Sequence, residues 1–370
     1  MLARMKALTV VPRKPGSGAV RDVPDPVARD GEVMVDVVRV GLCGTDAEIE
    51  RGEYGSAPPG SDLLVLGHES LGRIADDRGA LAKGTLVVAS VRRPDGCPNC
   101  ERGEQDMCVW GKFTERGIDG LHGYCAERYA ERPEYLFRVD QALEPVAVLL
   151  EPLTVSEKGL RHLWSAQRRM TVWEPRRAVV TGAGPVGILA ALALRLRGLE
   201  VTVIERTFKP ARGELLARIG ARYAATNDTP LASLGPVDVV LEATGSSAVA
   251  FAAIDLLGPN GAIVLTSVTG GGRSIELPAD ELNQRIVLRN LLILGSVNAN
   301  AEDFKAGIAD LALSEQRYPG FLGSLITRRV PLAEAASALP HDPTQIKTVV
   351  EIQRQVPLRS ESTASGAVRS

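Results

Sequence analysis

Three separate pieces of the chain carry side chains of the kinds that hold a catalytic zinc ion. In chain order they are Cys43, the adjacent pair His68 and Glu69, and Glu151. A catalytic zinc uses three protein ligands of sulfur, nitrogen or oxygen type and keeps one position open. Thiolate, imidazole and carboxylate supply such a set, and the ion would polarise a hydroxyl or carbonyl oxygen as a Lewis acid. The sequence therefore indicates a zinc site, if the fold brings these distant pieces together.

A glycine-rich turn, Thr181-Gly-Ala-Gly-Pro-Val-Gly187, is the clearest sign of a nucleotide site. Its first glycine permits the tight turn, its second lets the backbone approach a pyrophosphate, and its third lets the next helix pack close to the sheet. Unpaired N–H groups at the start of that helix attract the phosphates. We therefore expect the cofactor to contact Gly182, Gly184, Pro185, Val186 and Gly187.

The segments around this turn complete a dinucleotide-binding fingerprint. Residues 177–181 predict a buried strand, residues 188–197 a helix, and residues 200–205 a second strand that ends in Glu205. Strand, glycine turn, helix, strand and acid are typical of a doubly wound parallel sheet. An acid at the last position accepts hydrogen bonds from both ribose hydroxyls and repels a 2′-phosphate, which favours NAD.

Basic residues close to Glu205 leave NADP, or the use of both cofactors, as the alternative. Arg206 follows at once and could stack on adenine or pair with a 2′-phosphate. Lys209 and Arg212 lie a few residues further along the chain.

The nicotinamide half of the cofactor is expected at the ends of three further strands. These are predicted at 237–245, 261–267 and 290–296, and ligands of parallel sheets bind beyond the carboxyl ends of the strands. The residues expected there are Thr244, Leu265, Thr266 and Ser267, with Ser296, Val297 and Asn298 closing over the ring.

Composition limits the class of protein. A chain of 370 residues is longer than a single hydrophobic core usually accommodates, so we expect two domains. A formal net charge of -2 and 4% aromatic residues offer neither the basic surface nor the stacking platforms that nucleic acids need. The chain lacks the roughly eighteen consecutive apolar residues of a membrane span, and its start does not read as a signal peptide. We therefore expect a cytoplasmic protein with no membrane partner.

The pattern of predicted elements divides the chain. Short strands with Pro and Gly turns fill its first part, whereas strands alternate with helices in its middle. The predicted fold is α/β: a GroES-like β-rich catalytic domain of residues 1–155 and 298–352, and a Rossmann NAD(P)-binding domain of residues 156–297. A flexible tail is expected at 353–370. Residues 63–69 predict one strand that ends on the adjacent imidazole and carboxylate.

Six segments resemble the zinc-dependent medium-chain dehydrogenases and, within them, the archaeal-type glucose dehydrogenases. The segments are Gly41–Ile49, Leu64–Glu69, Phe113–Ile118, Leu150–Lys158, Gly295–Asn298 and Ile346–Thr348. The likeness runs in register over nearly all of residues 5–352, and the combination is far more specific than any one piece. Taken singly, Cys43 and His68 would more often be a small buried residue and a core histidine.

The resemblance implies that zinc is held by Cys43 and His68, with Glu69 and Glu151 as alternating or water-linked ligands. It further implies that Thr45 takes the substrate proton and passes it onward, which suits a hydroxyl that both donates and accepts. We therefore expect these five residues to form the catalytic group.

Three more positions bear on the substrate that the resemblance implies. In many alcohol dehydrogenases of the family, the proton relay ends at a His. This chain has Glu48 at that position, which agrees with the glucose branch. The route by which the proton leaves therefore stays open. Glu115 and Asn298 match that branch's sugar-binding positions, and with Thr45 and Glu151 they are expected to contact the substrate. A carboxylate and an amide suit the vicinal hydroxyls of a polyol. The alternatives are a solvated loop acid for Glu115 and a turn former for Asn298.

The five cysteines are expected to be metal ligands or free thiols, because the chain carries no sign of secretion. Cys97, Cys100 and Cys108 have the spacing of the family's structural zinc lobe, in which a fourth Cys stands where this chain has Pro94. The last lobe ligand could be Asp95 or Asp106, since a structural site needs four. A degenerate lobe held by packing is the alternative. The fifth cysteine, Cys125, is expected to be a buried thiol.

The expected function is zinc-dependent, NAD(P)-linked oxidation of a sugar or polyol hydroxyl, similar to that of glucose 1-dehydrogenases. A reductase of a biosynthetic pathway, acting on a sugar, an aminocyclitol or another alcohol, is the alternative because hydride transfer is reversible. A protein that keeps the fold without the chemistry is disfavoured by the complete set of ligands. Apolar residues at 286–288 and 291–294 favour a homodimer or homotetramer, although they would also suit an internal strand.

Overall fold

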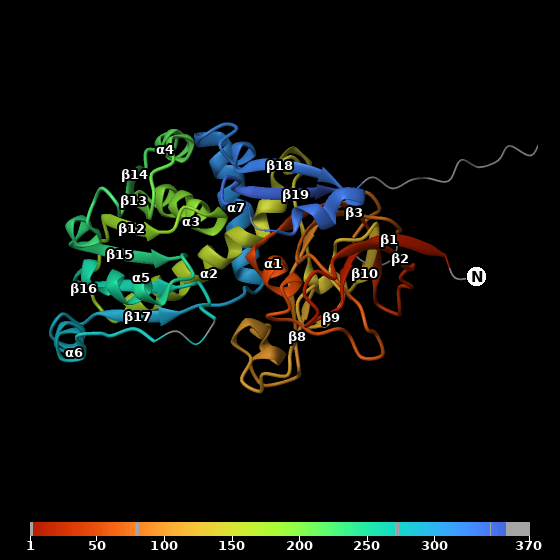
Figure 1. The fold of residues 1–370 in the computed structure, drawn as a ribbon, viewed down its shortest axis with the longest axis horizontal. Helices are drawn as coiled ribbons and strands as arrows, with labels where there is room; N and C mark the ends of the chain where they lie inside the picture. Colours follow the sequence, from red (N-terminus) through yellow and green to blue (C-terminus); the bar gives the residue numbers. More distant parts are fainter. Residues whose placement is uncertain (1–2, 78–80, 271, 273, 341, 353–370) are drawn as a thin grey trace, which may run out of the picture.

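The computed structural model describes residues 3–77, 81–270, 272, 274–340 and 342–352, so the predicted tail lies outside the described residues. Two groups of strands stand side by side with helices between them (Figure 1). One group is a six-stranded parallel sheet, and the other is a seven-stranded sheet accompanied by two small three-stranded sheets. The α/β fold class predicted from the sequence is confirmed.

The parallel sheet has the strand order β14-β13-β12-β15-β16-β17. Its strands are β12 (Arg177–Thr181), β13 (Glu200–Glu205), β14 (Arg222–Ala225), β15 (Val237–Glu242), β16 (Leu257–Leu265) and β17 (Leu292–Gly295). The helices that follow them are α3 (Pro185–Leu196), α4 (Pro210–Ala217), α5 (Ser247–Ala252) and α6 (Ala279–Leu288). The order of strands reverses between β12 and β15, and ligands of such sheets bind at that point.

The larger mixed sheet has the order β11-β6-β5-β3-β19-β18, with β10 also paired to β3. Its strands are β3 (Val33–Leu42), β5 (Glu69–Ile74), β6 (Leu86–Ala89), β10 (Arg128–Glu131), β11 (Leu136–Arg138), β18 (Ile326–Pro331) and β19 (Lys347–Glu351). Alternate residues of β3 are buried over its first half, as expected for a strand with one face on a core. The pairing of β19 with β3 brings the end of the described chain back to its beginning.

The two small sheets have the orders β2-β1-β4 and β7-β8-β9. Their strands are β1 (Arg4–Val10), β2 (Ala19–Pro24), β4 (Leu64–Val65), β7 (Arg92–Arg93), β8 (Thr114–Arg116) and β9 (Gly120–Leu121). A short helix, α1 (Gly44–Glu50), directly follows β3. The exact limits of the two domains stay a prediction from the sequence.

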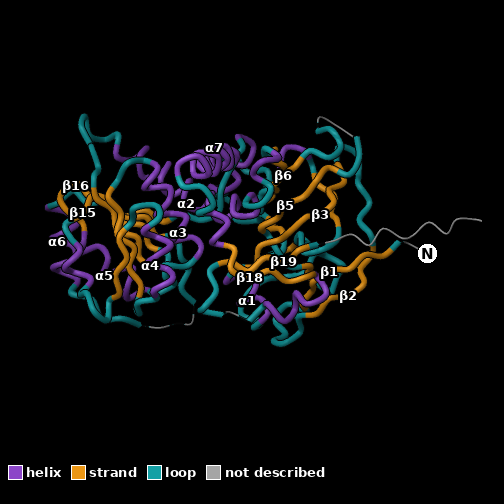
Figure 2. Tube along the Cα trace, turned by 90° about the horizontal axis from the view of Figure 1, so that it is seen from above, coloured by secondary structure: helices purple, strands orange, loops and turns teal. Residues whose placement is uncertain are grey.

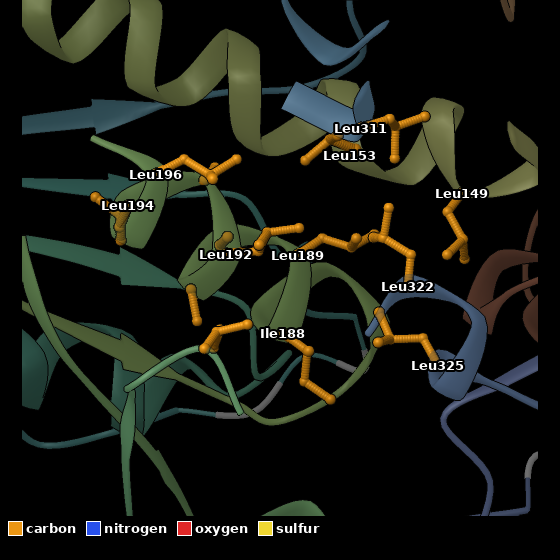
Figure 3. Packing of buried hydrophobic residues seen from close by; sticks show 14 of the residues in the cluster. Leu149, Leu153, Ile188, Leu189, Leu192, Leu194, Leu196, Leu311, Leu322 and Leu325 are labelled. Atoms are coloured by element: carbon orange, nitrogen blue, oxygen red, sulfur yellow. The ribbon is translucent and has the colours of Figure 1, made fainter. Parts of the chain in front are cut away.

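Helices α2 (Leu150–Gln167) and α7 (Ala301–Arg317) lie between the two groups of strands (Figure 2). Leu153 of α2 and Leu311 of α7 gather with Leu189 of α3 and with Leu322 in one buried cluster (Figure 3). The same cluster includes Leu71 of β5, so it continues into the β-rich part. Burying each leucine contributes about 1.5–3 kcal/mol, so this cluster stabilises the packing of the two parts against each other.

The prediction of one strand over residues 63–69 was wrong. The chain leaves β4 at Val65 and enters β5 only at Glu69. Between them Gly67 has a φ of +85°, and a Cβ there would lie 2.7 Å from Cγ1 of Val40. The glycine turn transfers the chain from a small sheet to the larger one, and period-2 patterning does not reveal such a switch. Within the described part of the chain, no helix is long and apolar enough to cross a membrane.

Candidate active site

Cys43 and His68 lie next to each other at the adjoining ends of two neighbouring strands. Cys43 follows β3, His68 precedes β5, and the antiparallel register pairs Gly41 with Glu69. The close approach requires glycine, because a Cβ on Gly41 would lie 1.9 Å from Oε2 of Glu69. As a result Sγ of Cys43 and Nε2 of His68 are 3.1 Å apart. Two of the predicted zinc ligands are therefore brought together by sheet register.

Asp46 anchors the backbone next to both members of this pair and was missed by the sequence analysis. Its buried carboxylate accepts from the backbone N–H of Cys43 at 3.0 Å and from that of Gly67 at 3.2 Å. It also lies 3.8 Å from Nδ1 of His68, on the side of the ring opposite the sulfur. A carboxylate on the far nitrogen orients the ring of a metal-binding histidine. The spacing of a capping box, three residues after the N-cap Cys43, could have revealed it.

Glu69 is held by a lysine from the other end of the chain. Nζ of Lys347 lies 2.6 Å and 2.7 Å from the two carboxylate oxygens of Glu69, and it donates to the carbonyl of Leu42 at 3.2 Å. All three groups are buried. Lys347 lies in one of the segments that carry the resemblance, but no role was assigned to it.

The donor atoms fit a zinc ion. One atom each from Cys43, His68 and Glu69 lies within 4.8 Å of the others, which gives a sulfur, nitrogen and oxygen set. Burial lowers the pKa of His68, but the charges of Cys43 and Asp46 outweigh burial and raise that pKa well above its ordinary value. Such an excess of negative charge around one imidazole is what a divalent cation would balance.

Glu151 lies in the first turn of α2, outside this set of three but within its electrostatic reach. Burial raises the pKa of its carboxyl to about 7, with a further contribution from Glu69 that His68 and Lys347 oppose. Its role as an alternating or water-linked ligand stays a prediction.

A cleft of about 540 Å³ runs between the two groups of strands and reaches the predicted site. Predicted residues on its wall are Cys43, Thr45, Glu69, Pro185, Val186, Thr244, Thr266, Ser267, Val297 and Asn298. Glu48 and Lys347 also line it. Among the other predicted residues, Leu265 packs in the apolar cluster beneath the sheet, and Ser296 donates its N–H to the carbonyl of Leu265. Two of the metal donors, Cys43 and Glu69, thus face the same space as Pro185 and Val186 of the glycine turn.

The glycine turn has the shape that a pyrophosphate needs. Gly182 has a φ of +99°, and a Cβ on Gly187 would lie 2.0 Å from the carbonyl oxygen of Gly182. At Gly184, the N-cap of α3, a Cβ would meet no atom within 4 Å, so open space lies beside the helix start. A phosphate there would face the unpaired N–H groups of the first helical turn.

A buried acid beneath the wall, Glu242, was also missed. It ends β15 and accepts hydrogen bonds from the backbone N–H of Thr244, at 2.6 Å, and from the hydroxyls of Thr244 and Ser267. These contacts fix two of the predicted nicotinamide-side residues. Its place within the strand predicted at 237–245, two residues before Thr244, was the available signal.

Glu205 ends β13 as predicted, and its charge is already compensated. Its Oε2 lies 3.0 Å from Nζ of Lys209 and 2.9 Å from a guanidinium nitrogen of Arg212, while the hydroxyl of Tyr223 donates to Oε1. Burial raises the pKa of Glu205, and the contacts with Tyr223, Lys209 and Arg212 lower it to a net value below the ordinary one. Arg206 is exposed. The repulsion expected between this acid and a 2′-phosphate is therefore reduced.

Glu115 and Asn298 lie in contact although the chain separates them widely. Nδ2 of Asn298 donates to Oε1 of Glu115 at 2.9 Å, and Arg92 pairs with the same oxygen at 3.0 Å. Glu115 is buried, so the interpretation as a solvated loop acid was wrong. The Asn298 backbone has a φ of +61°, which an asparagine tolerates well.

The cysteine lobe forms a closed set of four donors. One atom each from Asp95, Cys97, Cys100 and Cys108 lies within 4.8 Å of the others, and Cys108 Sγ lies 3.0 Å from Oδ2 of Asp95. The alternative ligand Asp106 points away and pairs with Lys158 at 2.9 Å. Three sulfurs and one oxygen fit a structural zinc, with Asp95 as the fourth ligand.

The remaining thiol, Cys125, is fully buried and free, as predicted. It takes no part in either group of donors.

A parallel nucleotide-binding sheet that faces a β-rich unit across a cleft, with Cys43 and His68 beside that cleft, defines a medium-chain dehydrogenase. Residues 29–141 match the family model described as "Alcohol dehydrogenase GroES-like domain", and residues 144–352 match "Glucose dehydrogenase C-terminus". The chain belongs to the glucose dehydrogenase branch of the zinc-dependent medium-chain dehydrogenase family. The resemblance seen in the sequence is confirmed.

Individual relatives agree over their whole lengths. A glucose 1-dehydrogenase of Methanocella arvoryzae is 44% identical over 358 residues, covering 94% of this chain and 99% of that protein. A glucose 1-dehydrogenase of Caldivirga maquilingensis is 40% identical over 353 residues, with the same coverage. A solved structure of Haloferax mediterranei glucose dehydrogenase in complex with NADP, Zn and gluconolactone is 33% identical, with a TM-score of 0.87 and coverage of 95% and 100%.

Proposed function

We propose that this protein oxidises the hemiacetal hydroxyl of an aldose such as glucose to a lactone, with zinc and NAD(P). The observation that carries this proposal is the 3.1 Å approach of the Cys43 sulfur and the His68 ring, beside a cleft that the nucleotide turn also lines. The relatives named glucose 1-dehydrogenase and the neighbour that holds gluconolactone support a sugar as the substrate.

Cys43 and His68 would hold the zinc, with Glu69 and Glu151 as the carboxylates that complete or exchange at the site. When bound, zinc supplies Lewis-acid polarisation of the substrate oxygen. Glu69 stays anchored to Lys347 in the described structure, which favours Glu151 as the carboxylate that exchanges. Asp46 places a negative charge 3.8 Å from Nδ1 of His68, on the side of the ring away from the sulfur.

The chain's own groups handle the proton and the hydride. Thr45 lies on the wall of the cleft and takes the proton of the substrate hydroxyl. Glu48 lines the same cleft, and burial raises the pKa of its carboxyl, so it is suited to accept that proton before solvent does. Thr244 and Ser267 would position the nicotinamide ring to receive the hydride.

We assign the sugar hydroxyls to Asn298 and Glu115. Asn298 lines the cleft, and its carboxamide is fixed at both ends, by Glu115 and by the backbone N–H of Ala299 at 2.8 Å. Glu115 is not among the residues that line the cleft but contacts Asn298, which does. In the described part of the chain no hydrogen bond engages its Oε2, and we assign this oxygen to a sugar hydroxyl. A plain alcohol would leave these polar groups unmatched, which disfavours it as a substrate.

Both nicotinamide cofactors are expected to bind. Glu205 can still accept from ribose hydroxyls, which suits NAD. Lys209 and Arg212 beside it offer two cations to a 2′-phosphate, which suits NADP.

We also propose a homodimer or homotetramer joined through β17. This strand is the edge of the parallel sheet, and Leu288 just before it is 72% exposed. An apolar sheet edge favours pairing with a second copy. Light scattering on purified protein measures this directly. The cytoplasmic location and the lack of a nucleic-acid partner stay predictions from the sequence.

One experiment tests the proposed function. Initial rates are measured with a panel of glucose, galactose, a polyol, an aminocyclitol and a plain alcohol, each with NAD and with NADP, on protein whose zinc has been counted. Lactone formation from an aldose, at a kcat/KM well above that for the plain alcohol, is the expected result. Turnover confined to the aminocyclitol or the plain alcohol would contradict the proposal and favour a different dehydrogenase on this scaffold.

A further inference from the structure

Lys158, a buried lysine of α2, has no role in the chemistry described above. Its side chain is 2% exposed, and its ammonium group lies close to three oxygen atoms. Nζ lies 2.9 Å from Oδ2 of Asp106 and donates to the carbonyls of Asp106 and Val297, at 3.3 Å and 2.7 Å. Burying a charged side chain costs free energy unless nearby groups compensate it. The groups that compensate Lys158 therefore indicate which segments this lysine holds together.

The partners of Lys158 belong to two segments that the chain separates widely. Asp106 lies at the base of the cysteine lobe, whereas Val297 lies on the wall of the cleft and directly precedes Asn298. Asp106 also accepts from Nδ2 of Asn300 at 3.2 Å, and Asn300 caps α7. Lys158 therefore connects the carbonyl of Val297, next to Asn298, to Asp106 at the base of the lobe.

Arg92 makes the complementary connection from the other side. Its guanidinium pairs with Oε1 of Glu115 at 3.0 Å and donates to the carbonyl of Asp106 at 3.3 Å. It stacks on the ring of Phe113 at 3.6 Å from the centroid. The antiparallel register of β7 and β8 places Arg92 opposite Glu115.

The contacts close into a ring. Starting from the sugar-side pair, the ring runs through Glu115, Arg92, Asp106, Lys158, Val297 and Asn298, and the bond from Asn298 to Glu115 completes it. Glu115 is thus paired directly with a cation, Arg92, whereas Asn298 follows the residue whose carbonyl binds the other cation, Lys158. Both cations donate to the same carbonyl of the lobe, that of Asp106.

We propose that Lys158 and Arg92 are positioning residues for sugar recognition, which hold Asn298 and Glu115 against the base of the cysteine lobe. The lobe then has a function beyond stability, because it is the common support of the two groups that face the sugar. This inference rests on the proposed function, since it concerns the binding of a sugar.

The test is a double-mutant cycle between Lys158 and Asn298 on the full-length, zinc-loaded enzyme. Lys158→Met is expected to raise KM for the sugar by about tenfold and to change kcat by less than about threefold, since the metal site is untouched. If Lys158 acts through Asn298, the same substitution in an Asn298→Ala background changes KM by less than about twofold. Nucleotide affinity without sugar should change little, because the glycine turn and Glu205 are not involved.

Glu157→Gln is the matched control, because Glu157 is the adjacent residue of α2 and forms another buried ion pair, 2.6 Å from Arg197. It should leave KM for the sugar unchanged. If Lys158→Met does not fold, Asp106→Asn replaces it in the double-mutant cycle with Asn298→Ala. The amide keeps the shape of the carboxylate but removes the charge that pairs with Lys158. Equal fold changes in both backgrounds, or an equal rise in Glu157→Gln, would overturn the inference. A wild-type enzyme without activity on any aldose would instead overturn the proposed function.

Discussion

Lys347 Nζ lies 2.6 Å and 2.7 Å from the two carboxylate oxygens of Glu69, although 278 positions separate the residues in the chain. The strand pairing of β19 with β3 brings them together beside the predicted zinc. Both side chains are almost completely buried. Each therefore compensates the buried charge of the other.

Replacing Lys347 by Met is expected to destabilise the protein by about 3–5 kcal/mol, since a buried carboxylate loses its partner. The melting temperature should fall and zinc should be retained less well. Thermal unfolding and metal analysis measure both effects. Lys305→Met is the control, because the pair of Lys305 and Glu302 is largely exposed and contributes little to stability. Equal melting temperatures for the two variants would contradict the assigned role of Lys347.

Cys43→Ala is expected to remove the catalytic zinc and to lower kcat/KM by roughly 10²–10⁴-fold, the equivalent of several kcal/mol of transition-state stabilisation. Nucleotide binding should survive, because the glycine turn is intact. Metal counting, initial rates and NADH fluorescence titration measure the three quantities. Cys125→Ala should retain zinc and activity, because this thiol is buried away from the donors. Full activity of Cys43→Ala would eliminate the zinc site as described.

Glu205→Gln is expected to shift the preference toward NADP by about tenfold in the ratio of kcat/KM values. Loss of the carboxylate frees Lys209 and Arg212 for the 2′-phosphate and weakens the contact with the ribose of NAD, which together amount to about 1.4 kcal/mol. Steady-state kinetics with both cofactors measure the ratio. Glu214→Gln, an exposed change on α4, should leave it unchanged. A shift toward NAD would mean that the two cations do not contact the phosphate.

Asp95→Ala tests the cysteine lobe. If Asp95 completes a structural site, the wild type holds two zinc ions per chain and the variant holds one, with a lower melting temperature because a closed site needs four ligands. Metal analysis of purified protein decides this. Pro94→Ala, which changes a neighbour that cannot ligate, is the control. A wild type with a single zinc would favour the alternative of a lobe held by packing.

Glu131 should make stability depend on pH at the acidic end. Burial raises the pKa of its carboxyl, but Arg93 and Arg116 lower it by more, so the folded value lies below the ordinary 4.5. Its stabilising contribution is therefore complete above about pH 4.5 and is lost as the pH falls through the folded value.

Glu131→Gln should cost about 3–5 kcal/mol near neutral pH, because Arg93 loses its buried partner. The difference in melting temperature between wild type and variant should shrink as the pH drops below about 4.5. Thermal unfolding across pH 3–7 measures it. A difference that stays constant over this range would show that Glu131 does not carry the effect.

The sequence by itself determined the elements whose signals are local. The glycine turn at 181–187, the strands that flank it and the acid at Glu205 follow from backbone freedom, apolar runs and spacing within a few residues. The motifs around Cys43 and His68, rather than the two residue types alone, were also sufficient to predict a metal. None of these statements needed a distance between remote parts of the chain.

Only the tertiary structure decided which groups are in contact. It joined Glu69 to Lys347, placed Asp46 behind His68, selected Asp95 over Asp106 in the lobe, and set Arg92 and Lys158 behind the pair assigned to the sugar. The physical reason is that charged side chains leave no periodic pattern in a sequence. Their partners are determined by sheet register and by the packing of α2 and α7, which act over hundreds of positions.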